Sequence, residues 1–369
     1  MGRGLDISFF GSSLVSAYWN GAATYYRGIL KELAARGHRI TFFEPDAYDR
    51  QAHRDIEDPP WAKVVVYRAE ESEVMRQLER ARRADLVIKA SGVGVFDELL
   101  ARGVLEVRRA GARAIFWDVD APATLERVGA DAADPFLALI PDYDLILTYG
   151  GGQPVVSGYA RFGARQCVPI YNALDPETHH PVPCDERFTC DLAFLGNRLP
   201  DREKRVDEFF LHAARLMPER QCLLGGSGWQ DKPLPENVRA LGHVYTRDHN
   251  ALNVSATAVL NINRDSMARF GFSPATRVFE AAGAGGCVIT DPFAGIEEFL
   301  EPGKEVLVAE SGAEVAGLVR RLTRQDARAI GAAARRRILA AHTYAHRAAE
   351  VERLLDGGAR QAGRAEAGA

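Results

Sequence analysis

The sequence predicts an α/β protein with two doubly wound parallel sheets, each belonging to its own domain. Short apolar segments alternate with longer helical patterns, and these segments are almost continuously apolar. Strands of a parallel sheet have this pattern because helices cover both of their faces. The alternation breaks into proline-rich chain over residues 168–183 and then restarts. With 369 residues, 47% of them hydrophobic, the chain is long enough for two domains of about 150–200 residues.

The first series of elements begins with the apolar run Asp6–Phe10 (DISFF), which predicts a strand. A helix is expected over residues 22–36, because Gly37 follows it as a stop signal. Further strands are predicted at residues 39–43, 64–67, 86–89, 114–117 and 145–148, and a further helix at 73–82. We therefore expect the first domain to span residues 1–170.

The second series has the same alternation. Strands are predicted at Cys190–Leu195 and at residues 221–224, 238–241 and 258–262, with helices at 201–216 and 249–255. These elements predict a second domain over residues 171–341. A last amphipathic helix is expected at 342–355, in a segment (342–356) that we expect to pack back on the first domain. Residues 357–369 are expected to form a flexible tail.

The overall charge argues against nucleic acid as a partner. The net charge is −4 and the pI is near 6.2, whereas duplex binding needs a clustered basic face. The first residues lack the apolar core of a secretion signal, and the sequence has no uninterrupted apolar run of about 18 residues, so neither a secretion signal nor a transmembrane segment is expected. We therefore expect a cytoplasmic protein, for which peripheral contact with a membrane stays open.

The cysteines do not indicate a disulfide framework. There are five of them, an odd number, and they show no CxxC spacing. Free or buried thiols are therefore expected. A metal site built from Cys184, Cys190 and His179 or His180 is the less favoured interpretation, and we expect no metal ion and no cofactor.

The segment SPATRVFEAAGAGGCVITD, which starts at Ser273, contains the most informative candidate site. Ser273 is a good N-cap and Pro274 suits the first helical position. At about 100° per residue, Ser273, Arg277 and Glu280 share one face of the predicted helix. The helix start can bind a phosphate, and Glu280 can accept hydrogen bonds from sugar hydroxyls. The alternative is an ordinary capped helix with an Arg–Glu pair on its solvated face.

Basic residues follow the first strand of the second domain. Asn197 and Arg198 lie at the end of that strand, and Arg202 and Lys204 come shortly after. Cations at a strand end and at the start of the next helix suit a diphosphate, because Arg offers a planar fork and Lys a point charge. A solvated basic helix face is the alternative.

Other candidate binding residues share a position just after a predicted strand. In parallel sheets, ligands bind beyond the carboxyl ends of the strands. Glycines in these loops can bring backbone N–H groups close to a ligand, although plain turns have the same composition. The residues of this kind are Gly11, Ser12, Gly226, His243, Asn263, Gly295 and Glu297.

Two carboxylates follow the predicted strand AIFW in the first domain. Asp118 and Asp120 lie in the sequence WDVDAP, and either is a candidate general base for an acceptor hydroxyl. The alternatives are that Asp120 caps the next helix and that Asp118 is a turn residue.

Several of these segments resemble one family. The succession GNR, a Gly-rich turn, GHV and FEAAGAGGCVITD…GIEEFLEPGKE resembles the nucleotide-binding half of two-domain GT-B glycosyltransferases of group 1. The segments FFGSSLVSAYWNGAATYYRGILKELAARGH and HTYAHRA resemble the CgeB-type (spore maturation protein) branch. The resemblance implies two Rossmann-like domains facing a cleft. It also implies sugar transfer from a nucleoside diphosphate donor to an acceptor on the first domain.

The resemblance also implies roles for individual residues. Glu280 matches the second glutamate of the family's Glu-x7-Glu pattern, which is expected on the ribose. Arg198 and Lys204 match the basic pair that neutralises the diphosphate, with a gap one residue longer than usual. The first glutamate falls at Phe272, which cannot hydrogen-bond a sugar.

We therefore expect a glycosyltransferase in which Arg198, Lys204 and the helix start stabilise the departing diphosphate without a metal. If the reaction inverts, Asp120 or Asp118 is the base. The acceptor can be a carbohydrate, a lipid, a protein or a small molecule.

The alternatives to a glycosyltransferase are a nucleotide-sugar epimerase and a non-catalytic sugar-nucleotide-binding or coat/scaffold protein. A Rossmann oxidoreductase is disfavoured, because the G-x-G-x-x-G fingerprint is missing.

Overall fold

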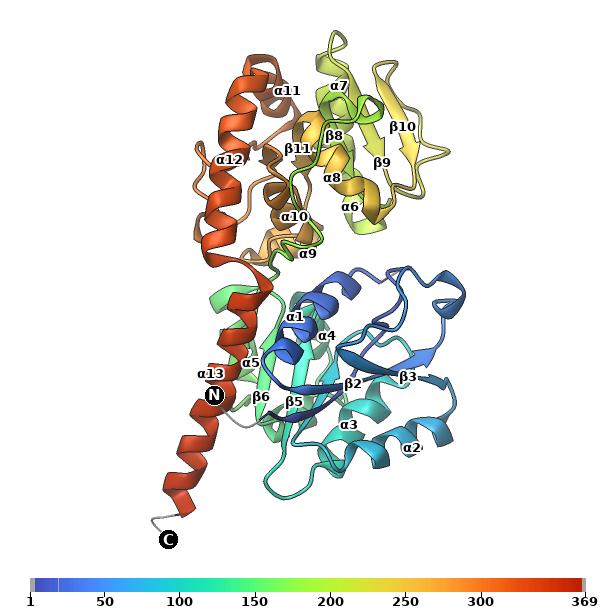
Figure 1. Ribbon diagram of the computed structural model, residues 1–369, viewed down its shortest axis with the longest axis vertical. Helices are drawn as coiled ribbons and strands as arrows, with labels where there is room; N and C mark the ends of the chain where they lie inside the picture. Colours follow the sequence, from blue (N-terminus) through green and yellow to red (C-terminus); the bar gives the residue numbers. More distant parts are fainter. Residues whose placement is uncertain (1–3, 19, 367–369) are drawn as a thin grey trace. The chain divides into compact units, whose positions relative to one another are not determined.

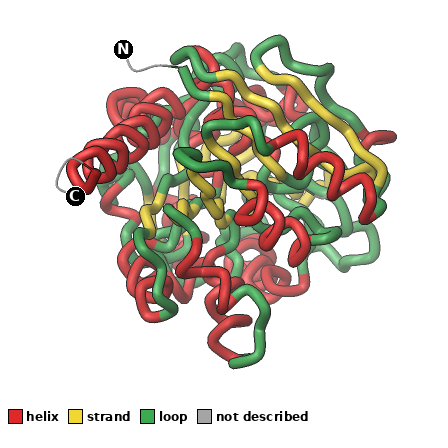
Figure 2. The backbone as a smooth tube through the Cα atoms, turned by 90° about the horizontal axis from the view of Figure 1, so that it is seen from below, coloured by secondary structure: helices red, strands yellow, loops and turns green. Residues whose placement is uncertain are grey.

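The computed structural model describes residues 4–18 and 20–366, which fold into two compact units (Figure 1). The first unit comprises the chain up to Tyr171 together with the segment from Tyr344 onward, and the second comprises Asn172–Thr343. In both units strands alternate with helices along the chain. Figure 2 shows the helices in red and the strands in yellow. The predicted fold class, α/β with two parallel sheets, is confirmed.

The sheet of the first unit has seven strands in the order β3-β2-β1-β4-β5-β6-β7, and all neighbours pair in parallel. The strands are β1 (Asp6–Phe10), β2 (Arg39–Asp46), β3 (Ala62–Arg68), β4 (Leu86–Ala90), β5 (Arg113–Asp118), β6 (Leu145–Thr148) and β7 (Cys167–Pro169). The strand order reverses direction between β1 and β4, which is where ligands bind in such sheets. The sequence predicts all of these strands except β7, which has only three residues and contains a proline.

The helices of this unit are α1 (Ala23–Ala35), α2 (Glu71–Ala81), α3 (Asp97–Val107), α4 (Ala121–Ala130), α5 (Gly152–Arg161) and α13 (Tyr344–Glu366), with short turns η1 (Gln51–His53) and η2 (Leu137–Asp142). The last helix, α13, packs on α1 (Figure 1). Gly28 permits this approach, because a Cβ atom there would lie 2.2 Å from the Tyr344 ring. Arg36, the residue directly after α1, pairs with Glu352 of α13 at 2.7 Å. Helix α13 continues to Glu366, into the stretch where a tail is predicted, and residues 367–369 lie outside the described chain.

The second unit has a six-stranded parallel sheet in the order β10-β9-β8-β11-β12-β13. The strands are β8 (Cys190–Leu195), β9 (Cys222–Gly225), β10 (Val238–Gly242), β11 (Ala256–Asn261), β12 (Val288–Thr290) and β13 (Leu307–Val308). The order reverses direction between β8 and β11, so the loops that follow these two strands mark the expected ligand position in this unit.

Helices surround this second sheet. They are α6 (Pro200–Val206), α7 (Ala213–Leu216), α8 (Thr246–Ser255), α9 (Asp265–Phe270), α10 (Thr276–Ala284), α11 (Gly312–Arg321) and α12 (Arg324–Ala341), with short turns η3 (Glu186–Phe188) and η5 (Ile296–Glu298). The single helix predicted at 201–216 is interrupted by a π-helical segment, η4 (Asp207–His212). Its wider turn buries three consecutive residues, Phe209, Phe210 and Leu211, in the core. Across the described residues, no helix is long and apolar enough to cross a membrane.

Candidate functional site

A buried carboxylate on α10 is the centre of the candidate site. Glu280 is 7% exposed, and Arg277 lies one turn earlier with its Nη1 3.6 Å from Glu280 Oε2. Burial raises the pKa of the Glu280 carboxyl, but electrostatic interactions with the neighbouring basic side chains, His179, Arg277 and His249, outweigh it, and the net pKa lies below the usual value. The helical spacing therefore brings Arg277 and Glu280 to one face, as the sequence indicates.

The predicted start of this helix is wrong. Helix α10 begins at Thr276 with Ala275 as its N-cap, so Ser273 does not cap it and Pro274 is not its first residue. Before the helix, Gly271 and Phe272 both have positive φ angles, 71° and 48°. The Phe272 N–H donates to the Ala294 carbonyl at 2.6 Å, which ties this segment to another loop rather than to the helix. Ser273 is buried in this connection.

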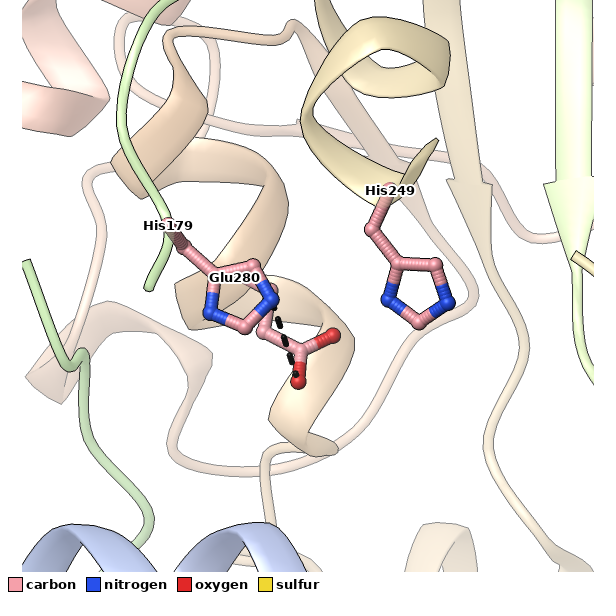
Figure 3. A group of neighbouring side chains, drawn as sticks. All are labelled: His179, His249 and Glu280. Atoms are coloured by element: carbon pink, nitrogen blue, oxygen red, sulfur yellow. Dashed lines mark ion pairs between the residues drawn. The ribbon is translucent and has the colours of Figure 1, made fainter. Parts of the chain in front are cut away.

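Two histidines from other elements flank Glu280 (Figure 3). His179 lies in the loop before β8, and its Nε2 is 3.8 Å from Glu280 Oε1. His249 comes from α8, and its Nε2 is 3.3 Å from the Val244 carbonyl oxygen. Burial, followed by the charge of Arg277, lowers the pKa of His249 to about 4, which keeps the ring neutral. His249 is not among the residues predicted from the sequence, because no local pattern links α8 to α10.

Three arginines lie close enough to interact in the same region. Burial, opposed by the charge of Asp201 and helped by repulsion from Arg264 and Arg277, lowers the pKa of Arg202 to about 10. Arg202 Nη2 donates to the Asn197 carbonyl at 2.6 Å. Arg202 Nε and Arg277 Nε and Nη1 are buried without a hydrogen-bond partner within the described chain. Buried N–H groups and mutual repulsion both favour an anionic ligand.

Arg198 and Lys204, the basic pair implied by the family resemblance, lack the unpaired buried N–H groups that Arg202 and Arg277 have within the described chain. Arg198 pairs with Glu203 and Asp231, each at 2.8 Å, and hydrogen bonds to these two carboxylates raise its pKa. Lys204 is exposed on α6. Arg202, also on α6, is a cation whose charge interacts with that of Arg277 on the Glu280 helix.

The strand-end loops of β8 and β9 contact each other. Gly226 has a φ of 122°, and a Cβ atom there would lie 2.2 Å from the Gly196 carbonyl oxygen. Asn197 Oδ1 accepts from the Ser227 N–H at 3.0 Å, which fastens the two loops together. Close approach of the backbones therefore explains the glycine. His243 is exposed, and the edge of its ring packs against Tyr245.

The loops after β11 and β12 are joined by a buried carboxylate. Asp291 accepts from the Asn263 N–H and from Asn263 Nδ2, at about 3 Å, and pairs with Arg205. Burial raises the pKa of Asp291 despite its hydrogen bond to Arg205. Asn263 therefore links the loop after β11 to the loop after β12 through these hydrogen bonds. Gly295 lies against the Phe272 ring, and Glu297 is exposed on η5.

The two carboxylates of the first unit differ in environment. Asp118 is fully buried at the end of β5. Its Oδ1 accepts from Ser91 Oγ and the Asp120 N–H, and its Oδ2 accepts from the Tyr159 hydroxyl. These three donors make Asp118 a structural carboxylate and remove the argument for it as a base. Asp120 is half-buried at the N-cap position of α4, so it is the remaining candidate.

The loop after β1 is enclosed by its own unit. Ser12 is 2% exposed and its Oγ donates to Asn20 Oδ1 at 2.9 Å. A Cβ atom at Gly11 would lie 2.5 Å from the Phe42 ring. Close packing therefore accounts for Gly11, and the Ser12 side chain is already engaged within the loop.

Comparisons with known proteins agree with this architecture. Residues 202–353 match a family model described as glycosyl transferase-like. Anabaena Alr3699/HepE, solved in complex with UDP and glucose, is 15% identical with a TM-score of 0.69, covering 96% of this chain and 100% of that chain. Sucrose-phosphate synthase from Thermosynechococcus elongatus is 16% identical with a TM-score of 0.67, covering 98% and 99%. AviGT4, a glycosyltransferase involved in avilamycin A biosynthesis, is 16% identical with a TM-score of 0.62, covering 96% and 97%.

No curated protein matches the sequence. The structural likenesses show that the protein has the GT-B fold with two Rossmann-like domains. The family match begins at Arg202 in α6. It includes Arg264, which directly precedes α9, and Arg277 and Glu280 of α10. The family match therefore covers most of the second unit, and the fold is one that these glycosyltransferases share.

Proposed function

We propose that this protein transfers a sugar from a nucleoside diphosphate donor to an acceptor, and that the second unit holds the donor. The observation that carries the proposal is the cluster of buried arginine N–H groups next to the Glu280 carboxylate. A nucleoside diphosphate has the matching chemistry, because its diphosphate is anionic and its ribose has hydroxyl donors. The complexes of Alr3699/HepE with UDP and with UDP-glucose support this donor class.

In this proposal Glu280 accepts hydrogen bonds from the ribose hydroxyls, and Arg202 and Arg277 bind the diphosphate. Arg198 and Lys204 add positive charge near the leaving group. To contact a phosphate, Arg198 gives up its ion pair with Glu203 or with Asp231. Charge on the departing diphosphate increases in the transition state, so preorganised cations lower the barrier. The proposal therefore requires no divalent ion for catalysis.

The acceptor side belongs to the first unit in this proposal. If the reaction inverts, Asp120 removes the proton of the acceptor hydroxyl, because Asp118 is enclosed by its hydrogen-bond donors.

We further propose the CgeB-like branch of the family, on the basis of the N-terminal and HTYAHRA segments. A cytoplasmic location is supported by the five free cysteines.

The test is a two-stage measurement on the full chain. Thermal shift with UDP, GDP and dTDP in metal-free buffer first identifies the base, since a ligand that binds the folded form raises its melting temperature. The corresponding nucleotide sugars are then incubated with carbohydrate, lipid, protein and small-molecule acceptors. Release of nucleoside diphosphate that requires the acceptor and persists with a chelator supports the proposal. Absence of nucleotide binding would contradict it.

One observation favours a second candidate, a non-catalytic sugar-nucleotide-binding protein. Phe272 occupies the position of the family's first glutamate, and its ring lies against Gly295, where it offers no hydrogen bond to a sugar. Nucleotide binding without turnover across the whole acceptor panel would favour this second candidate. Conversion of one nucleotide sugar into another without an acceptor would indicate an epimerase instead.

A further inference from the structure

Three Lewis-basic side chains meet in the second unit although they come from three separate elements. His179 precedes β8, His249 lies on α8 and Glu280 lies on α10. One ligand-type atom of each lies within 4.8 Å of the other two (Figure 3). We propose that His179, His249 and Glu280 form a binding site for a divalent transition-metal ion of the zinc class, which is occupied when no nucleotide is bound.

The separations suit a single ion after small side-chain movements. His179 Nε2 and Glu280 Oε1 are 3.8 Å apart. In a tetrahedral zinc site with bonds of about 2.0–2.1 Å, two ligand atoms are about 3.4 Å apart. Rotation of the histidine rings, whose centroids are 6.3 Å apart, can close this difference. The ion would then have three protein ligands and a fourth position for water.

The unpartnered nitrogen atoms provide an independent argument. His179 Nε2 and His249 Nδ1 are buried and have no hydrogen-bond partner within the described residues. His179 is 2% exposed, so water does not satisfy it readily. Buried polar atoms of folded proteins are nearly always paired, and two that point at one carboxylate indicate a missing ligand.

Neighbouring groups orient the candidate ligands, as is usual around metal ions in proteins. His249 Nε2 lies 3.3 Å from the Val244 carbonyl, which orients the ring and leaves Nδ1 as the lone-pair donor. Glu280 Oε2 faces Arg277 at 3.6 Å, so Oε1 remains for the ion. Arg277 repels a cation, but it also neutralises the charge of the second carboxylate oxygen.

The ligand set selects the class of ion. Two imidazoles and one carboxylate suit Zn²⁺, Co²⁺ and Ni²⁺, whereas Mg²⁺ and Ca²⁺ prefer oxygen ligands throughout. If Glu280 also binds the ribose, as the proposed function states, the ion and the nucleotide exclude each other. This consequence, unlike the metal site itself, depends on the proposed function.

Calorimetric titration of the full-length, metal-free protein with Zn²⁺ tests the site. We expect one ion per chain and an affinity for Zn²⁺ that is at least about 10-fold lower in His249→Ala and in His179→Ala. Even substitutions of residues that only hydrogen-bond to a metal ligand lower metal affinity by about this factor. His180→Ala is the matched control, since His180 is exposed and adjacent to His179. Equal affinity in His249→Ala and His180→Ala would overturn the proposal.

Titration with Co²⁺ distinguishes this site from the exposed Cys184. A visible spectrum without a thiolate-to-cobalt band is expected, and a strong band of that type would place the ion on cysteine and overturn the proposal. Glu280→Gln keeps the shape of the side chain and provides a second variant if an alanine variant does not fold. Retained Co²⁺ affinity in Glu280→Gln would contradict the assigned ligand set.

Nucleotide binding is measured separately in metal-free buffer. If UDP binds there but Zn²⁺ does not bind without UDP, the metal site is wrong and the proposed function stands. If Zn²⁺ binds with the expected variant pattern and no nucleotide binds, the metal site stands and the proposed function fails. If the metal site and the proposed function are both correct, Zn²⁺ weakens UDP binding competitively in the wild-type protein and not in His249→Ala.

Discussion

Arg277 and Glu280 lie one helical turn apart on α10, with Arg277 Nη1 3.6 Å from Glu280 Oε2 in the interior of the second unit. Burial disfavours both charges, and Arg277 Nε and Nη1 have no hydrogen-bond partners among the residues that the structure describes. A surface ion pair contributes little to stability, whereas an incompletely paired interior one is costly to maintain. We infer that the pair is retained for ligand binding.

Glu280→Gln is expected to weaken binding of the nucleoside diphosphate by about 1–3 kcal/mol, because a ribose hydroxyl loses its charged acceptor. Isothermal titration calorimetry measures the change, and the melting temperature shows whether the variant is folded. Glu236→Gln, on an exposed side chain, is the control. Unchanged affinity in a folded Glu280→Gln protein would refute the ribose role.

Arg202→Ala is expected to weaken UDP binding while leaving uridine binding nearly unchanged. The reason is that Arg202 interacts with Arg277 and has a buried Nε without a partner in the described structure, so its proposed ligand is the diphosphate. Calorimetry with both ligands separates the two contributions. Equal losses for uridine and UDP would argue against a phosphate contact.

Arg198→Ala is expected to lower kcat more than it lowers nucleotide affinity. Arg198 is paired with Glu203 and Asp231 in the unliganded protein, so its contact with the leaving group would strengthen as charge develops. Steady-state kinetics and UDP binding together provide the comparison. Parallel losses in kcat and affinity would indicate ordinary ground-state binding.

The two aspartates of the first unit should respond differently to amidation. Asp118→Asn is expected to lower stability by about 1–3 kcal/mol, because the buried carboxylate accepts three hydrogen bonds. Asp120→Asn is expected to lower the transfer rate by at least about 100-fold if Asp120 is the base. Melting temperature and kcat are measured on both variants. An unchanged rate in Asp120→Asn would exclude it as the base.

The cysteines should differ in native reactivity. Burial raises the pKa of Cys167, Cys190, Cys222 and Cys287 to about 12 each, whereas Cys184 is exposed. Native alkylation at pH 8 should therefore label Cys184 first, and all five thiols should react after unfolding. Mass spectrometry of the labelled peptides measures this order. Rapid labelling of Cys222 or Cys287 in the folded protein would contradict it.

The same raised thiol pKa values predict a loss of stability in alkali. The unfolded thiols ionise near their ordinary value of 9.0 and the folded ones only near 12. The folded state therefore binds more protons in this interval, and the free energy of unfolding falls as pH rises from about 9 to 12. Replacing Cys222 by alanine should reduce the thiol part of this slope, measured by urea unfolding at several pH values.

The sequence by itself determined the fold class and most of the strands. Continuous apolar runs and helical periodicity are local properties, and burial on both faces of a parallel sheet imposes them residue by residue. The same periodicity placed Arg277 and Glu280 on one helix face. It did not locate the helix start at Thr276, because the positive φ angles at Gly271 and Phe272 depend on the contact with Ala294.

Only the tertiary structure decided which distant residues surround Glu280. His179 and His249 come from two other elements, and no sequence spacing encodes their convergence on Glu280. Arg202 of α6 likewise comes close enough to Arg277 for their charges to interact. The tertiary structure also decided which charged groups already have partners. Arg198 and Asp118 are residue types that occur in reactive sites, but both are paired within the fold. Long-range packing sets burial and partners, and these determine which side chains remain available for a ligand.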